Sequence, residues 1–207
     1  MAKKMNWWRV RDQSLAVAVR NVGFDLAVFD EYTKGSQSEL KKHSIAEALR
    51  LLEDAFFDAT KKELKSITKG VYVICLSNPF AIQYGAGISE IIYIGQGNVL
   101  SRLKSHYERS LFDFMQSLSG TNFDFYISEP KQNKASDYYK HVEHLLLDEF
   151  SSRIGGGKRE FPLLNKNAGS NKKYGTQLGW DLPLKRAGKK PQWVLERTKF
   201  WNFAPLD

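Results

Sequence analysis

The sequence predicts an α+β protein with a small, largely antiparallel three-stranded sheet flanked by helices. A helical N-terminal arm precedes this unit and a basic C-terminal extension follows it. The prediction depends on the order of the periodic segments, which is helix, strand, strand, helix, strand, helix. It also depends on size, because 207 residues with 42% hydrophobic content can bury one good core. We therefore expect an arm over residues 1–67, a central domain over 68–168 and an extension over 169–207.

The arm contains two apolar segments. Residues 14–29 are mostly apolar around Gly23, which predicts a buried helix that breaks near this glycine, or two short elements. Residues 36–67 carry apolar residues at steps of three and four between charged residues, which predicts one amphipathic helix. These apolar residues are Ile45, Leu49, Leu52, Phe56 and Phe57.

Two predicted strands open the central domain. Residues 70–76, GVYVICL, and residues 90–95, EIIYIG, are rich in β-branched and aromatic residues and are bounded by turn formers. Between them, residues 77–89 contain a proline and two glycines, which predicts a loop or a wide hairpin.

The rest of the central domain alternates between helix and strand. Residues 98–118 form a predicted helix and residues 123–129 a predicted strand. Residues 135–154 form a second helix, which a run of three glycines ends. The apolar face of the first helix contains Leu100, Leu103, Tyr107, Leu111 and Phe114, and that of the strand contains Phe123, Phe125 and Ile127.

The charge, the cysteine count and the lengths of the apolar segments limit the kinds of partner and site that this protein can have. The net charge is +8 at pH 7 and the pI is about 9.4, which favours a polyanionic partner such as nucleic acid. The single cysteine, Cys75, excludes a disulfide framework and a Cys-based zinc site, and we interpret it as a small buried apolar residue. No segment is long and apolar enough to predict a bilayer span or a signal peptide. We expect a soluble, intracellular (cytoplasmic) protein without a membrane partner.

Two triplets mark the two predicted strands: GVY at residues 70–72 and YIG at residues 93–95. Arg102 follows on the next predicted helix, Glu143 lies on the helix after the third strand, and Asn165 comes after a proline-containing loop. In this order the set resembles the GIY-YIG nuclease family, in particular its restriction-endonuclease-like members.

This chain departs from the family pattern at three points. Val71 replaces the isoleucine of the first triplet, which is a conservative change in a buried strand. Tyr72 and Tyr93 are 21 positions apart, which resembles the expanded loop of the family's restriction endonucleases. Gln96 stands where a basic residue often follows the second triplet, so no lysine is assigned a part in activating the nucleophile.

The resemblance implies how the matched residues would hydrolyse a phosphodiester bond. Tyr72 would act as the general base toward the attacking water, which requires nearby positive charge or a hydrogen bond. Arg102 would clamp the scissile phosphate as a fork-shaped donor. His106 follows four residues later on the same helix face and would assist Tyr72.

Glu143 is the implied metal ligand. A single carboxylate, completed by waters and phosphate oxygens, suits Mg²⁺ or Mn²⁺. Tyr93 would orient a phosphate or a water through its hydroxyl, and Asn165 would hold the site together by hydrogen bonds. The resemblance thus implies six catalytic residues: Tyr72, Tyr93, Arg102, His106, Glu143 and Asn165.

The same residues also have purely structural interpretations. Tyrosines in strands are most often core residues with a satisfied hydroxyl, and Glu143 could pair with Lys140 or face water. His141 and His144 flank Glu143 and suggest zinc, but they are three residues apart rather than the four of the H-E-x-x-H proteases. We therefore interpret both histidines as part of a polar helix edge.

The C-terminal extension is a predicted DNA-contacting region. Residues 169–207 contain eight lysines and arginines against three acidic residues. Trp180, Trp193 and Trp201 lie among them, and we expect them to anchor the extension on the domain while the lysines face phosphates. The expected DNA-binding residues are Lys158, Arg159, Lys172, Lys173, Lys185, Arg186, Lys189 and Lys190.

The sequence thus predicts a DNA endonuclease that uses Mg²⁺ or Mn²⁺ and is restriction-like. Cleavage of both strands with one site per chain would require a homodimer or two successive nicks. Two alternatives stay open: a low-specificity repair or mobile-element nuclease, and a nucleic-acid-binding module that has lost catalysis.

Overall fold

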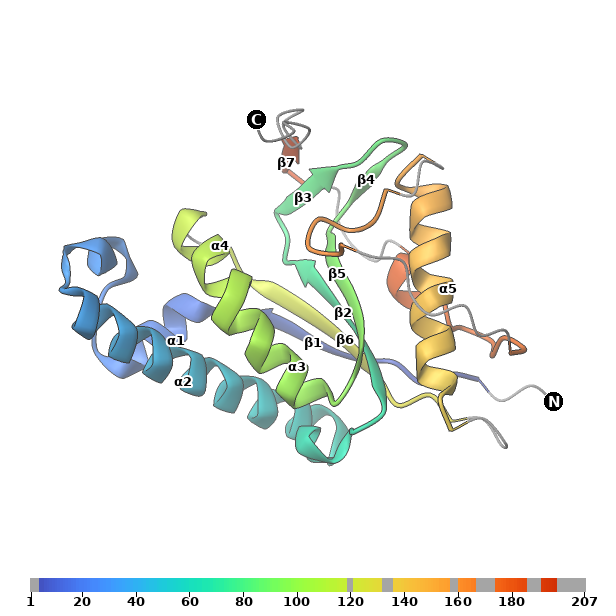
Figure 1. Ribbon diagram of the computed structural model, residues 1–207, viewed down its shortest axis with the longest axis horizontal. Helices are drawn as coiled ribbons and strands as arrows, with labels where there is room; N and C mark the ends of the chain where they lie inside the picture. The colour runs from blue at the N-terminus through green and yellow to red at the C-terminus, as the bar shows by residue number, and fades with distance from the viewer. Residues whose placement is uncertain are drawn as a thin grey trace, which may run out of the picture.

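The computed structural model describes residues 4–118, 121–131, 136–156, 160–166, 174–185 and 191–196. It is a mixed α+β structure in which β2 (Gly70–Leu76) and β5 (Ile91–Gly97) run between α3 (Val99–His106) and α5 (Tyr138–Arg153), as Figure 1 shows. Within the described part of the chain, no helix is long and apolar enough to cross a bilayer.

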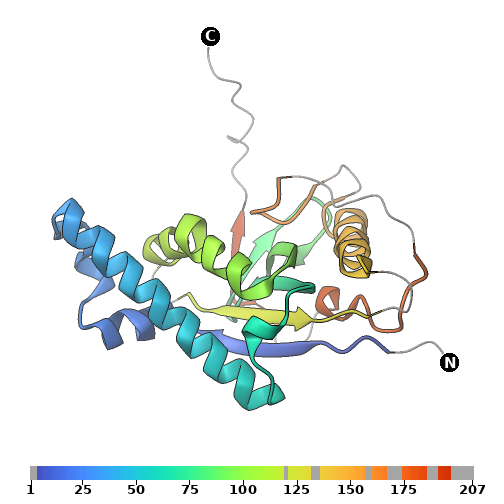
Figure 2. The ribbon, with the colours of Figure 1, turned by 60° about the horizontal axis from the view of Figure 1, so that its bottom comes forward.

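The central sheet has four strands rather than the predicted three. Their order is β1-β6-β2-β5, and each neighbouring pair is antiparallel. Strand β6 (Phe123–Ser128) and the central β2 match the predicted segments. The fourth strand is β1 (Trp8–Gln13), which pairs with β6 and makes the N-terminal arm part of the sheet (Figure 2).

The remainder of the arm is helical. Helix α1 (Leu15–Val22) ends at Gly23, whose φ of 97° lies in the left-handed region, and a 3-10 turn (Leu26–Glu31) follows. Residues 14–29 thus form the two short elements that the central glycine predicts. Helix α2 (Lys34–Thr60) begins at Thr33, whose side chain accepts a hydrogen bond from the Ser36 amide.

The amphipathic helix α2 differs from its prediction at its C-terminal end. It stops at Lys61, whose φ is 57°, and the predicted last turns are instead a separate 3-10 turn (Leu64–Ser66). Phe56 is fully buried against the ring of Trp8, but Phe57 is 48% exposed because it lies beside the apolar stripe rather than on it. The prediction of Phe57 as a core residue is therefore wrong.

The predicted helix over residues 98–118 is not regular throughout. Helix α3 passes into a π-helical turn (Tyr107–Leu111) and then into α4 (Phe112–Ser117). The π turn buries Tyr107 and Leu111, and the Phe112 amide bonds the Tyr107 carbonyl. A π turn inserts one residue into the helical register, and such turns are frequent at functional sites.

A second, smaller sheet covers one end of the first. Residues 77–89 form a hairpin of β3 (Phe80–Gln83) and β4 (Ile88–Ser89), which is the wide-hairpin alternative. Strand β7 (Trp193–Glu196) from the C-terminal extension pairs in parallel with β3, unlike the antiparallel pairs among the other described strands. A short 3-10 turn (Leu182–Leu184) precedes it.

The tryptophans of the extension behave differently from one another. Trp180 packs against the core, and beside it the Trp7 indole donates a hydrogen bond to the Gly179 carbonyl over 3.2 Å. Trp193 is 62% exposed, so it is not the anchor that we expected. Trp201 lies outside the described residues.

Both faces of the central strands are buried. All residues of β2 and β6 are buried, including Cys75, as the sequence predicts, and Asp124. The Asp124 carboxylate accepts hydrogen bonds from the Arg9 guanidinium, the Asp12 amide and the Ser77 hydroxyl. It therefore joins three segments on the face of the sheet opposite to Tyr72.

Replacement of Asp124 tests this junction. Asp124→Ala is expected to lower the free energy of unfolding by about 3 kcal/mol, because it leaves the buried Ser77 hydroxyl, the partly buried Arg9 guanidinium and the Asp12 amide without their acceptor. Asp54→Ala is the matched control: its carboxylate also pairs with an arginine, Arg50, over 2.6 Å but is 60% exposed, so a change within about 0.5 kcal/mol is expected. Urea unfolding measures both, and equal effects would contradict the assignment.

Candidate active site

The two tyrosines of the triplets face the same side of the sheet. In the β2–β5 register Tyr72 lies opposite Gly95 and Tyr93 lies opposite Ile74, so both side chains project from one face. Their rings stack at a centroid distance of 5.9 Å with an interplanar angle of 24°. Tyr72 is fully buried and Tyr93 is half-buried.

Gly95 makes this stacking possible. A Cβ at this position would lie 2.5 Å from Cε1 of Tyr93 and 2.7 Å from the hydroxyl oxygen of Tyr72. Any side chain would therefore displace one of the two rings. The last residue of the YIG triplet is thus required by the packing of the two tyrosine rings.

Helix α3 brings His106 to the same place. Gly97, with a φ of 119°, turns the chain out of β5, and the Asn98 side chain caps α3 by accepting from the Ser101 amide over 3.1 Å. His106 Nε2 lies 2.9 Å from the Tyr72 hydroxyl oxygen, within hydrogen-bond distance. Its ring also lies 4.1 Å from the ring of Tyr93.

Asn165 contacts the site through the main chain. Its side-chain oxygen accepts from the Ile94 amide over 2.9 Å, and its side-chain nitrogen donates to the Ile94 carbonyl over 2.8 Å. A further hydrogen bond joins the Leu164 amide to the Ile92 carbonyl over 2.9 Å. These contacts continue the edge of β5 and fix the strand segment that carries Tyr93.

Glu143 is a half-buried carboxylate on α5. It forms no ion pair or hydrogen bond with any described residue, and Lys140 instead lies 5.9 Å from the centroid of the Tyr139 ring. Burial raises the pKa of Glu143 to about 7, and the positive charge of Arg102 opposes this rise. Near neutral pH this half-buried group is therefore divided between the neutral acid and a carboxylate without an ion-pair partner.

Arg102 is exposed on α3 and acts electrostatically on all the other charged or polar groups of the cluster. Its positive charge opposes the rise in the pKa of Tyr72, Tyr93 and Glu143 and contributes to lowering the pKa of His106. It has no ion-pair partner among the described residues. The guanidinium is thus free to bind an anion.

The tyrosine and histidine groups are neutral around pH 7. Burial lowers the pKa of His106 to about 4, with contributions from Arg102 and Arg109. Burial raises the pKa of Tyr72 well above its ordinary value, and it also raises that of Tyr93, where the negative charge of Glu143 adds to the effect. The pair of Tyr72 and His106 therefore consists of a phenol and a neutral imidazole that can accept its proton.

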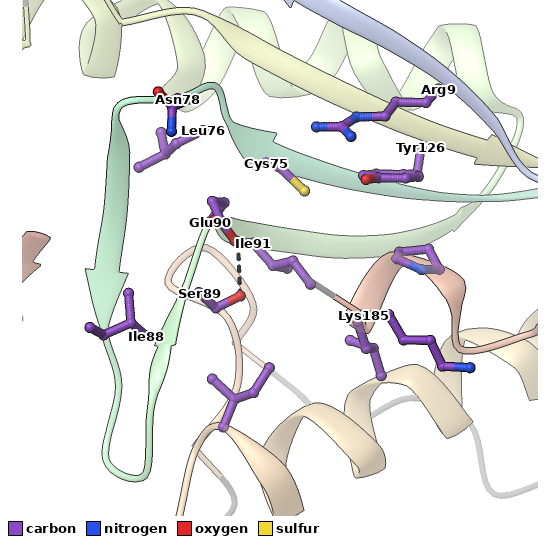
Figure 3. Close-up of a pocket in the computed structure, with 13 residues that line it drawn as sticks. Arg9, Cys75, Leu76, Asn78, Ile88, Ser89, Glu90, Ile91, Tyr126 and Lys185 are labelled. Carbon is purple, nitrogen blue, oxygen red and sulfur yellow. Dashed lines mark hydrogen bonds between the residues drawn. The ribbon is translucent and has the colours of Figure 1, made fainter. Parts of the chain in front are cut away.

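The structure thus brings the six predicted site residues together from β2, β5, α3, α5 and the segment around Asn165. The expected DNA-binding residue Lys185 lies elsewhere. It pairs with Asp181 over 3.1 Å and lines a cavity of about 90 Å³ on the opposite face of the sheet, beside Cys75, Tyr126 and Arg9 (Figure 3). Outside the described residues lie Lys158, Arg159, Lys172, Lys173, Arg186, Lys189 and Lys190.

The neighbouring histidines do not form a metal site with Glu143. His141 is buried and its Nε2 accepts from the Tyr174 amide over 3.3 Å, whereas His144 Nε2 lies 3.1 Å from Asp148. In the described ranges, no group of three or more His, Cys, Asp or Glu side chains is placed to hold a metal. The unpartnered carboxylate of Glu143 fits an ion that keeps most of its water ligands, as Mg²⁺ does.

Two residues of the site were not singled out from the sequence. Gly95 has its role because it faces the Tyr72 ring across two strands, which no local pattern reveals. Arg109 contributes positive charge at His106, and its position three residues after this histidine on the same helical segment is the signal that could have identified it.

Comparisons with protein-family models, curated proteins and solved structures find no match to this chain.

Gly95→Ala tests the packing of the tyrosine pair. We expect the free energy of unfolding to fall by about 2 kcal/mol, because a stiff ring must move to admit the new methyl group. Gly87→Ala is the matched control, since nothing lies within 4 Å of its Cβ position. Chemical denaturation measures the change, and the His106 imidazole resonance reports whether the hydrogen bond to Tyr72 persists. A neutral Gly95→Ala substitution with an unchanged resonance would contradict the packing role.

Glu143→Gln tests the buried charge. Below about pH 4.5 this carboxyl is protonated in the folded and unfolded states, so the variant and the parent should be equally stable. As pH rises from 4.5 to about 7 the parent loses stability, because the unfolded state ionises in this range while the folded state resists ionisation, and above about pH 7 the loss is complete. At pH 8 without divalent ions the variant should be more stable by about 2 kcal/mol.

Glu149→Gln on the same helix is the control for this experiment. Its carboxylate is more exposed and pairs with Arg153 over 3.3 Å, so a change within about 0.5 kcal/mol is expected at both pH values. Thermal unfolding across the pH series measures the difference. A Glu143→Gln curve parallel to that of the parent would show that Glu143 is not destabilised by burial.

Proposed function

We propose that the protein is a divalent-metal-dependent DNA endonuclease of the GIY-YIG type, restriction-like in its action, which hydrolyses phosphodiester bonds. The observation that carries this proposal is the unpartnered Glu143 carboxylate in a cluster with the free guanidinium of Arg102 and the hydrogen-bonded pair of Tyr72 and His106. An anion-binding group, a cation-binding group and a proton acceptor are the three parts that phosphodiester hydrolysis requires.

Tyr72 and His106 act together as the base. Tyr72 by itself is a poor proton acceptor, because its hydroxyl is protonated near neutral pH. Its proton can pass to His106 Nε2 over the 2.9 Å between them while its oxygen takes a proton from the attacking water. This transfer requires the His106 tautomer with hydrogen on Nδ1. The low pKa of His106 keeps its Nε2 unprotonated near neutral pH, and it also makes the imidazole a weaker base than an exposed histidine.

Arg102 on α3 and Glu143 on α5 approach the scissile phosphate from two different helices. Arg102 offers its fork of donors to the scissile phosphate, and Glu143 from α5 supplies the carboxylate ligand for the cation. A bound Mg²⁺ or Mn²⁺ would neutralise developing charge on the phosphate and stabilise the leaving oxygen. The half-buried position of Glu143 strengthens its attraction for a cation, because fewer waters screen the carboxylate.

Tyr93 and Asn165 have positioning roles. The Tyr93 hydroxyl, half-buried beside both Tyr72 and His106, orients a water or a phosphate oxygen. Asn165 fixes the backbone of Ile94 and so keeps Tyr93 in register. Because all six residues lie on one chain, each chain carries one site, and cleavage of both strands uses a homodimer or two nicks.

A plasmid assay tests the proposal. Supercoiled plasmid incubated with the protein and Mg²⁺ should be converted to discrete nicked or linear products. Tyr72→Phe should lower the rate by at least about 100-fold, because the variant cannot relay a proton. Glu143→Gln should lose metal-dependent cleavage, whereas Glu149→Gln should retain it. At subsaturating Mg²⁺ the parent rate should fall about tenfold per pH unit below pH 7, as Glu143 becomes protonated.

The outcomes separate the candidate functions. Discrete fragments support a restriction-like enzyme, whereas a smear or a preference for flaps and single strands identifies a low-specificity nuclease. Plasmid that shifts in mobility but stays intact across several substrate sequences identifies a binding module without catalysis. Cleavage that survives EDTA or Glu143→Gln would contradict the metal role.

A further inference from the structure

Arg109 is the second free arginine on the segment that carries Arg102 and His106. It is exposed, lies in the π turn that follows α3, and forms no ion pair or hydrogen bond with a described residue. Figure 2 shows the segment from α3 to α4 as one helical rod, and Arg102 in α3 and Arg109 in the π turn both belong to it.

The acidic groups closest to Arg109 in sequence are engaged with other partners. Asp113 lies four residues later, the spacing that pairs charges on a regular helix, but it binds Lys41 of α2 over 2.7 Å. Glu108 instead lies 3.9 Å from Lys104. The π turn that contains Arg109 changes the helical register before Asp113, which accounts for the missing pair.

The positive charge of Arg109 lies near the catalytic cluster. It is one of the two guanidinium groups that help to lower the pKa of His106. Most other described arginines have partners: Arg9 binds Asp124, Arg50 binds Glu47 and Asp54, and Arg153 binds Glu149. Two unneutralised guanidinium groups on either side of His106 form a short positive track beside the site.

We propose that Arg109 is a second phosphate-binding residue, which holds a further phosphate on the same nucleic-acid strand as the one that Arg102 clamps. The two arginines are seven positions apart, which is about 10 Å along a helix. Phosphates of one strand advance by about 3.4 Å per nucleotide along a duplex, so the two arginines span about three nucleotides. Arg109 would fix the register of the strand in the site.

This inference rests on the proposed nuclease function, and the experiment separates the two. A fluorescein-labelled DNA duplex of mixed sequence is titrated, in EDTA, with the Glu143→Gln protein at salt concentrations from about 50 to 200 mM. When Arg109→Ala is introduced into the Glu143→Gln protein, the affinity for the duplex should fall about tenfold. The slope of log K against log salt should decrease in magnitude by about 1, because one phosphate contact is lost. Arg109→Lys should keep the slope, since it keeps the charge.

Lys104→Ala is the matched control, because it also removes one positive charge from α3. Lys104 pairs with Glu108 and lines a groove between α2 and α3, so its removal should leave the slope unchanged. In the cleavage assay, Arg109→Ala alone should raise KM about tenfold and leave kcat near that of the parent, because it removes binding common to the ground and transition states. Its thermal stability should be unchanged.

The other outcomes contradict either the phosphate contact of Arg109 or the proposed nuclease function. An unchanged salt slope for Arg109→Ala, with binding intact in the Glu143→Gln background, would refute the phosphate contact and leave the nuclease proposal standing. A fall in kcat without a change in KM would place Arg109 in the chemical step instead. Absence of DNA binding by the Glu143→Gln and parent proteins alike would overturn both this inference and the proposed function.

Discussion

The antiparallel pairing of β2 with β5 is the constraint on which the site depends. It sets Gly95 against Tyr72 and shifts Tyr93 by one diagonal step, so that two aromatic rings can stack on one face of the sheet. The same ladder ends at Gly97, from which α3 starts at an angle that returns His106 to the tyrosines. If the register of the β2–β5 pairing shifted by one residue, one of the two tyrosines would face the other side of the sheet. The cluster would then no longer form.

Burial of the ionisable groups of the site lowers the free energy of unfolding, and packing elsewhere in the fold must compensate for this loss. Glu143 is held partly out of water without a counter-ion, and Tyr72 and His106 are buried in their neutral forms. Burial of such groups lowers stability, and the densely packed strands β2 and β6 supply the compensating apolar burial. A charge without a partner in an otherwise well-satisfied structure is typical of a site prepared for a ligand rather than for folding.

Much of the central unit was predictable because its signals are local. The β-branched runs defined β2 and β5, the turn formers between them allowed the hairpin, and the apolar step pattern defined α2 and α3. The order of the motif residues, together with a family resemblance, identified the residues that the structure brings together. Strand β1 was missed because its alternation of Trp8 and Val10 with arginines is short and ends in the polar pair of Asp12 and Gln13. The partner of Arg9, Asp124, lies 115 positions away. The pairing of β7 with β3, the π turn after His106 and the exposed Phe57 likewise depend on contacts distant in the sequence or on helical phase, which composition does not reveal.

The position of β1 at the edge of the central sheet has a consequence for how this chain is synthesised. Its partner β6 is separated from it by more than a hundred residues, with Arg9 and Asp124 being 115 apart, so the first strand leaves the ribosome long before the strand that completes it. Until β1 docks, the edge of β6 presents an apolar ladder of unpaired amides and carbonyls to any neighbouring chain. A bulky fusion immediately before β1 would prolong that exposure, whereas β7, the last described strand, pairs with β3 in the other sheet and takes no part in this pairing. An affinity tag immediately before β1 therefore favours an aggregated product, and a tag away from β1 favours a soluble one.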